Sequence, residues 1–424
     1  MPNFYYMKLL IKQAKIINSS SPFNGLTKDI LITNGIIQSI SDTISAEVDQ
    51  IISTPNLCVS IGWMDLFADF CDPGFEHKES IETGAKAAAA GGFTQVAILP
   101  NTNPVVHSKS QVEYITQKSI SQPVTIFPIG TVTKNAEGKE LSEMYDMRQS
   151  GAIAFSDGKN CLQSSGILLK ALQYVTAFNG IIIQVPDDKS INPQGLINEG
   201  IISTQLGLPG KPAIAEEMII ARDIELVKYT NSKIHFTGVS TQKSIELIAK
   251  AKADGLQVTC SVTPYHLYFC DEDLKTYDTN LKVNPPLRTR KDMQALKEAV
   301  QSGVVDCFAS HHIPQDYDNK VCEFEYSKNG MIGLETLFSV ITSCGIKTED
   351  FIAMQTQNIR SILNLPIPTI EEKATASLTL FVPTEKQIWN EDSFQSKSNN
   401  SPFIGKVLTG KVIGIIHKNN LVLN

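Results

Sequence analysis

Residues 233–262, which read KIHFTGVSTQKSIELIAKAKADGLQVTCSV, contain the pattern that decides the fold. The apolar runs at the two ends, KIHFT and LQVTCSV, have the length and β-branched content of buried strands. Between them, KSIELIAKAKADG places apolar residues at helical intervals and ends in Asp-Gly. Two strands joined by one helix form a βαβ unit with parallel strands.

The same alternation continues on both sides of this unit. TQVAILP (94–100), GIIIQVP (180–186) and VVDCFAS (304–310) read as further buried strands, and KDMQALKEAVQSG (291–303) reads as another helix. Regular alternation over this length predicts an α/β protein built on a (β/α)8 barrel of the TIM type. We therefore expect functional side chains at the carboxyl ends of the strands.

The two ends of the chain have a different pattern. Residues 8–53 alternate apolar and polar side chains and contain Asn-Gly at 34–35, as antiparallel strands with tight turns do. LTLFVP (378–383) and GKVIGIIHKNNLVLN (410–424) also read as strands. The two ends are therefore expected to meet beside the barrel.

From these patterns we predict two domains. Residues 1–55 and 373–424 together form a small β-sandwich domain, and residues 56–372 form a barrel of the kind found in metal-dependent hydrolases. The polar stretch EDSFQSKSNNS at 391–401 reads as a flexible loop.

Composition limits the possible partners. The 424 residues carry a formal net charge of -7 and show no basic cluster, which argues against nucleic-acid binding. There is no apolar run long enough to span a bilayer and no secretory signal. The eight cysteines include no C-x-x-C pair, which favours reduced thiols. We expect a cytoplasmic protein without a membrane or nucleic-acid partner.

Seven blocks of sequence carry a family resemblance. They are EHKESIETGAKAAAAGGFTQVAILPNTNP (76–104), FSDG (155–158), LGLPGKPAIAEEMIIARDIEL (206–226), VTPYHL (262–267), KVNPPLR (282–288), GLETL (333–337) and SPFIGKVLTGKV (401–412). In kind and order they resemble the dihydroorotase branch of the amidohydrolase superfamily. Seven blocks in the same order are a specific signal, because each must arise at its own position.

The resemblance implies a binuclear zinc centre, but this chain departs from its ligand set. The family places a His-x-His pair after the first barrel strand, which here lies in MDLFADFCDPG (64–74). Phe67 and Asp69 stand at the two histidine positions. A phenyl ring offers no lone pair to a cation, so one of the two metal ligands of this pair is absent.

The remaining ligand positions are altered in the same way. The bridging ligand falls on Asp157, which is retained, whereas the two later histidines fall on Gln184 and Gly238. The aspartate that serves the family as general base falls on His311. One of the six ligand positions is therefore kept.

The positions that the family uses for substrate are also changed. Cys71 stands where an arginine clamps the substrate carboxylate, and Gln315 replaces a histidine that contacts it. Asn101 and Asn284 are retained. Both lie in turn-rich segments, so they serve either as substrate contacts or as turn residues.

Two interpretations of the altered site remain open. Asp69, Asp157 and His311 could still converge on a single zinc or other divalent ion, because their number and type match a catalytic site. The same side chains could instead satisfy one another where the metals would lie. We expect no cofactor in the second case.

Three functions follow from the resemblance. The first is a catalytically inactive structural or regulatory subunit of pyrimidine biosynthesis, bound to aspartate carbamoyltransferase as non-catalytic dihydroorotase-like subunits are. The second is an active hydrolase of a cyclic amide, dihydroorotate or a related ureide, with a remodelled single-metal site. The third is a homo-oligomer with a partner outside this pathway or a ligand-sensing role. In each case we expect a homo-oligomer.

Overall fold

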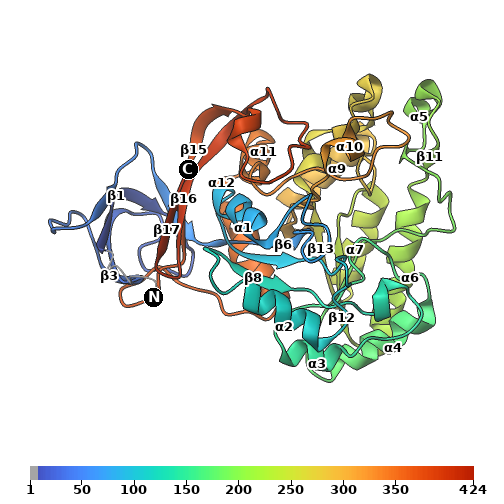
Figure 1. Cartoon of the computed structure of the whole chain (residues 1–424), viewed down its shortest axis with the longest axis horizontal. Coiled ribbons are helices and arrows are strands. Elements are labelled where there is room, and N and C mark those ends of the chain that lie inside the picture. Colours follow the sequence, from blue (N-terminus) through green and yellow to red (C-terminus); the bar gives the residue numbers. More distant parts are fainter. Residues whose placement is uncertain (1–7) are drawn as a thin grey trace.

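The computed structural model describes residues 8–424, so the first seven residues of the predicted terminal domain lie outside the described part. Figure 1 shows a smaller β-sheet region at one end, which both ends of the chain enter, and a larger region of strands surrounded by helices. The mixed α/β class predicted from the sequence is confirmed.

Two parallel sheets form the centre of the larger region. Their strands are β6 (Trp63–Ala68), β7 (Phe93–Ile98) and β8 (Thr125–Pro128) in one, and β9 (Ile182–Gln184), β12 (Lys233–Thr237), β13 (Gln257–Val262) and β14 (Cys307–Phe308) in the other. All pairings within the two sheets are parallel. The residues of β6 are buried on both faces, as expected for a parallel strand covered by helices.

Single parallel bridges join the two sheets into a ring. Phe155 bridges Gly130, just after β8, and Ile182 in β9. On the other side, Ala68 at the end of β6 bridges His312, just after β14. Seven strands and the segment at Phe155 thus follow one another around the ring, so the ends of strands distant in sequence lie together.

Helices surround this ring (Figure 1). They are α1 (Ile81–Ala90), α2 (Lys109–Lys118), α3 (Met144–Gln149), α4 (Ser165–Thr176), α5 (Ile201–Leu206), α6 (Ile214–Thr230), α7 (Gln242–Ala253), α8 (Pro264–Tyr268), α9 (Arg290–Gln301), α10 (Tyr317–Lys320), α11 (Leu337–Ser343), α12 (Thr348–Ala353) and α13 (Ile359–Ile362). The helices predicted at 243–255 and 291–303 are confirmed as α7 and α9. Thr241 and Thr289 cap them by accepting backbone N–H groups with their hydroxyls.

Strands from both ends of the chain form one sheet. They are β1 (Lys8–Ile16), β2 (Thr27–Thr33), β3 (Ile36–Ser41), β4 (Gln50–Ile52), β5 (Cys58–Ile61), β15 (Leu378–Ile388), β16 (Val407–His417) and β17 (Asn420–Leu423). A separate two-residue pairing joins β10 (Ile197–Asn198) to β11 (Gly210–Lys211). Strand β5 joins the two ends, since it pairs with both β1 and β15. The turn predicted at Asn34-Gly35 is confirmed: both residues have positive φ, as type I′ hairpins require.

Residues 391–401, which we call the strap, differ from the prediction of a flexible loop. Ser396, Ser398, Asn400 and Ser401 are all buried. Asn400 Nδ2 donates to the carbonyls of Ile313 and Gly330, at 3.1 Å each. The prediction was wrong because the polar side chains that suggested a solvated loop bind backbone groups of the larger region instead.

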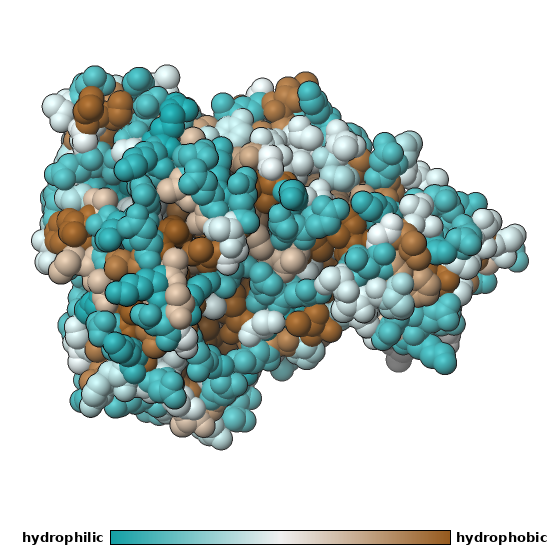
Figure 2. Space-filling model, turned by 180° about the vertical axis from the view of Figure 1, so that it is seen from behind, coloured by the Kyte–Doolittle hydropathy of each residue, from teal (hydrophilic) through white to brown (hydrophobic). Residues whose placement is uncertain are grey.

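The outer surface is mixed in character. On the face shown in Figure 2, apolar residues lie in separate small groups among polar ones, which is ordinary for a folded domain. Within residues 8–424, none of the helices has both the length and the apolar character needed to cross a membrane.

Candidate functional site

The carboxyl end of β6 places Phe67 against His311. Asp65 fixes this end, because its carboxylate accepts the Ser310 N–H at 2.7 Å and the Ser310 hydroxyl at 2.8 Å. The Phe67 and His311 rings are stacked, with centroids 4.4 Å apart and planes 29° apart. Both side chains are buried. The first lost ligand position is therefore part of an aromatic stack.

His311 is held as a neutral imidazole. Its backbone has a φ of 43°, and its Nε2 shares a 2.8 Å hydrogen bond with the Thr237 hydroxyl at the end of β12. Burial lowers the pKa of His311 to about 3. At neutral pH this side chain therefore carries no charge and is a weak proton acceptor.

Gly238 leaves the space that the imidazole occupies. A Cβ added at Gly238 would lie 2.7 Å from His311 Cε1 and 3.3 Å from Pro285 Cδ. The φ of Gly238 is 71°, which L side chains rarely adopt. A side chain at 238 and the observed position of His311 are thus mutually exclusive. We call Phe67, Gly238 and His311 the aromatic plug.

Gln184 at the end of β9 is bonded at both ends of its amide. Its Oε1 accepts the Leu162 N–H at 3.1 Å, and its Nε2 donates to Asp223 Oδ2 at 2.9 Å. Asp223 on α6 also pairs with Arg222 at 2.7 Å, and burial raises the pKa of Asp223 to about 6. The amide therefore joins a strand end to a helix.

Asp157, the retained bridging position, serves a turn. Its Oδ1 accepts the N–H groups of Val132 and Thr133, both at 2.9 Å, and its Oδ2 accepts the Thr133 hydroxyl at 2.5 Å. Burial raises the pKa of this carboxyl despite these donors. Asp157 is the residue that the family pattern has at the bridging position. Its three hydrogen bonds nevertheless direct its carboxylate towards the loop after β8.

Asp69 is paired with a lysine that the sequence did not indicate. Its Oδ2 lies 2.7 Å from Lys159 Nζ, and its Oδ1 accepts the Cys71 N–H at 2.9 Å. Burial, the largest effect, raises the pKa of Asp69, but the charge and hydrogen bond of Lys159 together with the hydrogen bonds from Cys71 outweigh it and lower the pKa overall. Burial, followed by the Asp69 charge, raises the pKa of the Cys71 thiol. An ammonium thus supplies the positive charge beside Asp69, and Cys71 is a neutral thiol.

The predicted substrate positions are bound within the protein. Asn101 donates to the Asp157 carbonyl at 3.0 Å and accepts the Lys159 N–H at 2.9 Å, so it braces that loop. Asn284 Oδ1 accepts from Lys211 Nζ at 3.0 Å. Gln315 Oε1 accepts from Lys78 Nζ at 3.0 Å. Each of the three amides thus has a protein partner.

Asp69, Asp157 and His311 do not converge. Each has separate partners, and in the part of the chain from residue 8 onward no group of three or more His, Cys, Asp or Glu side chains is placed to hold a metal ion. The geometry therefore does not support the predicted three-ligand site.

Two polar arrangements near the site were not predicted from sequence. Below His311, the hydroxyls of Thr237 and Ser261 are 2.9 Å apart, and Ser261 lies 3.0 Å from His235 Nε2. This continues the hydrogen-bonded chain from His311 into the ring. The only sign of this chain in the sequence was that β12 and β13 both carry hydroxyl residues. The register of the two strands places Thr237 opposite Ser261 and so sets the contact.

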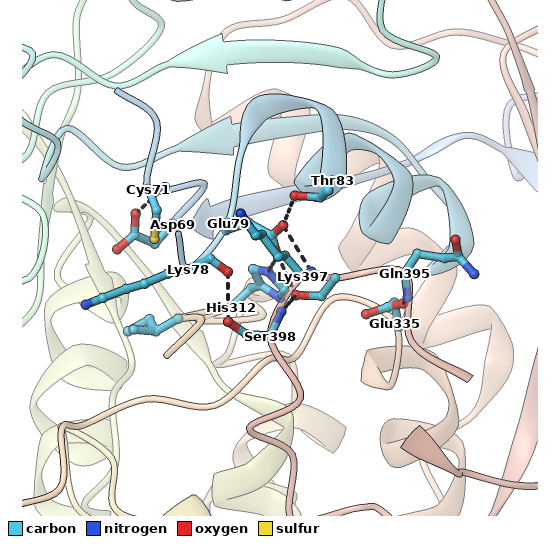
Figure 3. A network of polar contacts seen from close by, with 12 residues as sticks. Asp69, Cys71, Lys78, Glu79, Thr83, His312, Glu335, Gln395, Lys397 and Ser398 are labelled. Carbon is cyan, nitrogen blue, oxygen red and sulfur yellow. Dashed lines mark hydrogen bonds and ion pairs between the residues drawn. The ribbon is translucent and has the colours of Figure 1, made fainter. Parts of the chain in front are cut away.

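The second arrangement joins the site to the strap (Figure 3). His312 Nε2 lies 3.4 Å from Glu79 Oε2, and both side chains are fully buried. Glu79 also accepts the hydroxyls of Thr83 and Ser396. Burial raises the pKa of Glu79, but these contacts outweigh burial and lower it overall. Ser398 donates to the Lys78 carbonyl at 2.8 Å, which fixes the strap beside the segment that precedes α1.

Comparison with known proteins agrees with the resemblance seen in the sequence. A family model described as "Dihydro-orotase-like" matches residues 57–244. A protein named dihydroorotase from Syntrophus aciditrophicus is 35% identical over 423 residues, covering 98% of this chain and 99% of its own. One with the same name from Caldanaerobacter subterraneus is 39% identical over 418 residues, covering 96% and 95%.

Solved structures show the same fold. The L-hydantoinase of Arthrobacter aurescens superposes with a TM-score of 0.85 over 99% of this chain and 96% of its own, at 20% identity. The dihydropyrimidinase of Brevibacillus agri superposes with a TM-score of 0.81 over 99% and 95%, at 18% identity. At these identities the likeness concerns the fold alone.

Proposed function

This chain belongs to the dihydroorotase family of the amidohydrolase superfamily, and we propose that it is a member without hydrolytic activity that acts as a structural or regulatory subunit on a (β/α)8 barrel. The aromatic plug carries this proposal. It places carbon and a neutral imidazole at three of the six positions where the family resemblance puts zinc ligands or the general base.

The side chains present do not fit a binuclear zinc centre. Phe67 and Gly238 have no donor atom, and the Gln184 amide is bonded at both ends. The Asp157 carboxylate already accepts three protein donors. Protein zinc sites use three or four nitrogen, sulfur or oxygen donors. Here only the Asp69 carboxylate, itself paired with Lys159, and the His311 imidazole, bonded to Thr237, remain.

Base catalysis and substrate binding are weakened as well. A pKa of about 3 leaves His311 a poor general base at neutral pH, because an efficient base titrates near the operating pH. The neutral Cys71 thiol cannot form the two parallel hydrogen bonds with which an arginine holds a carboxylate.

We propose aspartate carbamoyltransferase as the partner of a homo-oligomer of this chain, following the family resemblance. The pattern of retention supports a role for the fold itself. Gly158 is kept where a Cβ would lie 1.8 Å from Asn101 Oδ1, and Gly74 is kept where one would lie 2.3 Å from the Asn103 carbonyl. Backbone-determining glycines remain while ligands do not.

The test combines metal content with turnover. Freshly purified, tag-free protein is assayed for metals by elemental mass spectrometry and for dihydroorotate hydrolysis with added Zn²⁺, Co²⁺ or Mn²⁺, with the Caldanaerobacter relative as the positive control. We expect no turnover and far less than one metal per chain. Metal-dependent turnover would refute the proposal. Copurification with aspartate carbamoyltransferase then tests the partner, and recovery of homo-oligomers alone would count against it.

A second candidate is a cyclic-amide hydrolase with a single metal. Two observations favour it. The relatives described above are named dihydroorotase, and Lys159, which pairs with Asp69, is partly exposed to solvent. If turnover is found, Asp69→Asn should abolish both activity and metal binding. Asp157→Gln is the comparison, because that carboxylate is bonded to the loop after β8.

A further inference from the structure

The inside of the ring of strands carries polar side chains on two neighbouring strands. The side chains that β12 and β13 direct towards the helices are apolar: Ile234, Phe236, Val258, Cys260 and Val262. Because side chains alternate along a strand, the intervening residues His235, Thr237, Thr259 and Ser261 point into the ring. Barrel interiors are normally filled by branched apolar side chains, so polar ones on two adjacent strands call for an explanation.

These four side chains and His311 form one continuous row of hydrogen bonds. The Thr259 hydroxyl lies 2.9 Å from His235 Nδ1, and His235 Nε2 lies 3.0 Å from the Ser261 hydroxyl. The Ser261 and Thr237 hydroxyls are 2.9 Å apart, and Thr237 lies 2.8 Å from His311 Nε2. We call these five side chains the polar row. It leads from β13 to the aromatic plug without a gap.

A cavity at the amino ends of the strands adjoins one end of the polar row. It has a volume of about 480 Å³, and its lining includes Thr259 together with Lys233 and Gln257, the first residues of β12 and β13. Thr259 is partly exposed, whereas every other member of the row is buried. Its hydroxyl also lies 3.4 Å from the Ile234 carbonyl, the longer of its two contacts. Solvent therefore reaches the polar row at Thr259.

The hydrogen bonds determine where each hydrogen lies. The Ser261 hydroxyl donates to Thr237, so the Ser261 oxygen accepts from His235 Nε2, and Thr237 donates its own hydrogen to His311 Nε2. Burial, the largest effect, lowers the pKa of both imidazoles to about 3, so each ring is neutral with a single N–H. His235 thus carries its hydrogen at Nε2 and accepts from Thr259 at Nδ1, and His311 carries its hydrogen at Nδ1.

We propose that the polar row is a proton relay between the cavity at the amino ends of the strands and the imidazole of the plug. Each hydroxyl and each neutral imidazole can donate and accept at the same time, as a relay requires. The inference does not rest on the proposed function. The relay uses neither metal nor substrate, so it would operate in an active or an inactive chain.

One transfer moves one hydrogen along each bond of the row. A proton from solvent in the cavity binds the Thr259 oxygen, whose own hydrogen passes to His235 Nδ1. The Nε2 hydrogen of His235 passes to Ser261, the Ser261 hydrogen to Thr237, and the Thr237 hydrogen to His311 Nε2. The Nδ1 hydrogen of His311 leaves to water, so one proton has crossed and every group keeps its number of hydrogens. His311 then presents a bare Nδ1 in place of an N–H, and transfer in the opposite direction restores the first state.

The test follows the ring hydrogens of the full chain labelled with ¹⁵N-histidine. Long-range ¹H–¹⁵N spectra show which ring nitrogen carries hydrogen, and His235→Phe and His311→Phe assign the two signals among the seven histidines. We expect hydrogen at Nε2 of His235 and at Nδ1 of His311.

Transfer to D₂O then measures hydrogen exchange at the His235 ring. This ring is fully buried, so its N–H exchanges through the polar row or through opening of the fold. The backbone N–H of His235, in a strand paired on both sides, reports opening alone. We expect the ring N–H to exchange at least about tenfold faster than this backbone N–H.

Four variants separate the relay from the packing of the barrel. Thr259→Val and Ser261→Ala each remove one hydroxyl of the row and should slow exchange of the ring N–H by about tenfold or more. Thr259→Ser keeps the hydroxyl and should exchange within about threefold of wild type. Thr125→Val is the matched control, because the Thr125 hydroxyl also lies 2.9 Å from a histidine, His417 Nε2, but outside the row. It should leave the exchange unchanged. Circular dichroism confirms that each variant is folded.

Two results would overturn the proposal. One is ring exchange at His235 that is no faster than backbone exchange, or that is equal in wild type, Thr259→Val and Ser261→Ala. The other is hydrogen at Nε2 of both His235 and His311, because the hydroxyls of Ser261 and Thr237 could not then donate in one direction along the row.

Discussion

The aromatic plug and the residue pair Glu335 and Trp389 use buried polar groups in opposite ways. In the plug, the imidazole of His311 is neutral, stacked on Phe67 and bonded to Thr237. Glu335 and Trp389, by contrast, each keep one buried polar atom without a partner among the described residues. Groups of the first kind stabilise the fold, whereas groups of the second kind reduce its stability. The comparison predicts that substitutions in the plug destabilise the fold and that removal of the Glu335 carboxyl does not.

The largest expected effect is at Gly238. Gly238→Ala should destabilise the protein by about 3 kcal/mol, because it combines a positive φ with a Cβ placed 2.7 Å from the His311 ring. Urea unfolding followed by circular dichroism measures the change. The matched control is Gly25→Ala, where φ is 80° but no atom lies within 4 Å of the added Cβ. It isolates the cost of φ, about 1 kcal/mol.

A double-mutant cycle shows whether His311 causes the effect. In a His311→Ala background, the same Gly238→Ala change should cost much less and only slightly more than the control, since the ring is gone and Pro285 Cδ, at 3.3 Å, is the remaining close neighbour. Equal costs in the two backgrounds would mean that the plug is not a mutually fitted pair. The helix and strand content by circular dichroism must match between the two backgrounds.

The next effect concerns the cation beside Asp69. Lys159→Met should destabilise the protein by about 2 kcal/mol at pH 7, less than for a fully buried pair because the Lys159 side chain is 40% exposed. The pKa of Asp69 is lowered from 3.8, so the stabilisation is present above that value and is lost as pH falls through the folded-state pKa. The difference from wild type should therefore shrink in acid.

The exposed pair between Lys134 and Glu140 is the control for this measurement. Lys134→Met should change stability by less than about 0.5 kcal/mol, because both side chains are mostly in solvent. A cost for Lys159→Met that is equally small, or independent of pH, would show that Asp69 does not need its cation.

The sequence predicted the elements that depend on local pattern. The βα periodicity located α7 and α9 to within two residues, and Asn34-Gly35 located a hairpin turn. The family blocks also identified Phe67 and Gly238 as positions without a metal donor, because residue type alone decides that. These features need no knowledge of distant partners.

The remaining features depend on contacts between distant residues. Asp69 and Lys159 are ninety residues apart in the chain, and nothing near either one indicates their pairing. Asp157 has the right residue type for a ligand, but the backbone at Val132 and Thr133 determines its direction. The strap has the composition of a loop, yet its hydroxyls and amides bind buried backbone groups. Composition cannot distinguish these partners from water.

A smaller effect is expected in the pH dependence of the plug. His311 has a pKa of about 3 when folded and about 6.5 when unfolded, so the unfolded state binds more protons as pH falls between these values. Stability due to this group is therefore lost as pH falls below about 6.5. His311→Phe keeps a stacked ring but has no imidazole to protonate. Between pH 7 and pH 5, the free energy of unfolding of this variant should therefore fall by about 1 to 2 kcal/mol less than that of wild type. Phe67→Leu keeps the imidazole and should retain the wild-type pH dependence.

The smallest effect has the opposite sign and concerns Glu335. The pKa of Glu335 is raised from 4.5 to about 8, so above pH 4.5 the unfolded state loses a proton that the folded state keeps, and stability falls as pH rises towards 8. Glu335→Gln removes this titration and should stabilise the protein by about 1 kcal/mol at pH 8, part of the gain being offset by an unpaired amide hydrogen.

Urea unfolding at pH 5 and pH 8 tests this prediction, with Glu79→Gln as the control. Glu79 is also buried, but its contacts with His312, Thr83 and Ser396 lower its pKa, so its replacement should destabilise the protein at both pH values. A loss of stability in Glu335→Gln at pH 8 would show that Glu335 serves the fold as Glu79 does. A gain would mean that the chain retains a buried carboxyl at 335 that destabilises the fold at this pH.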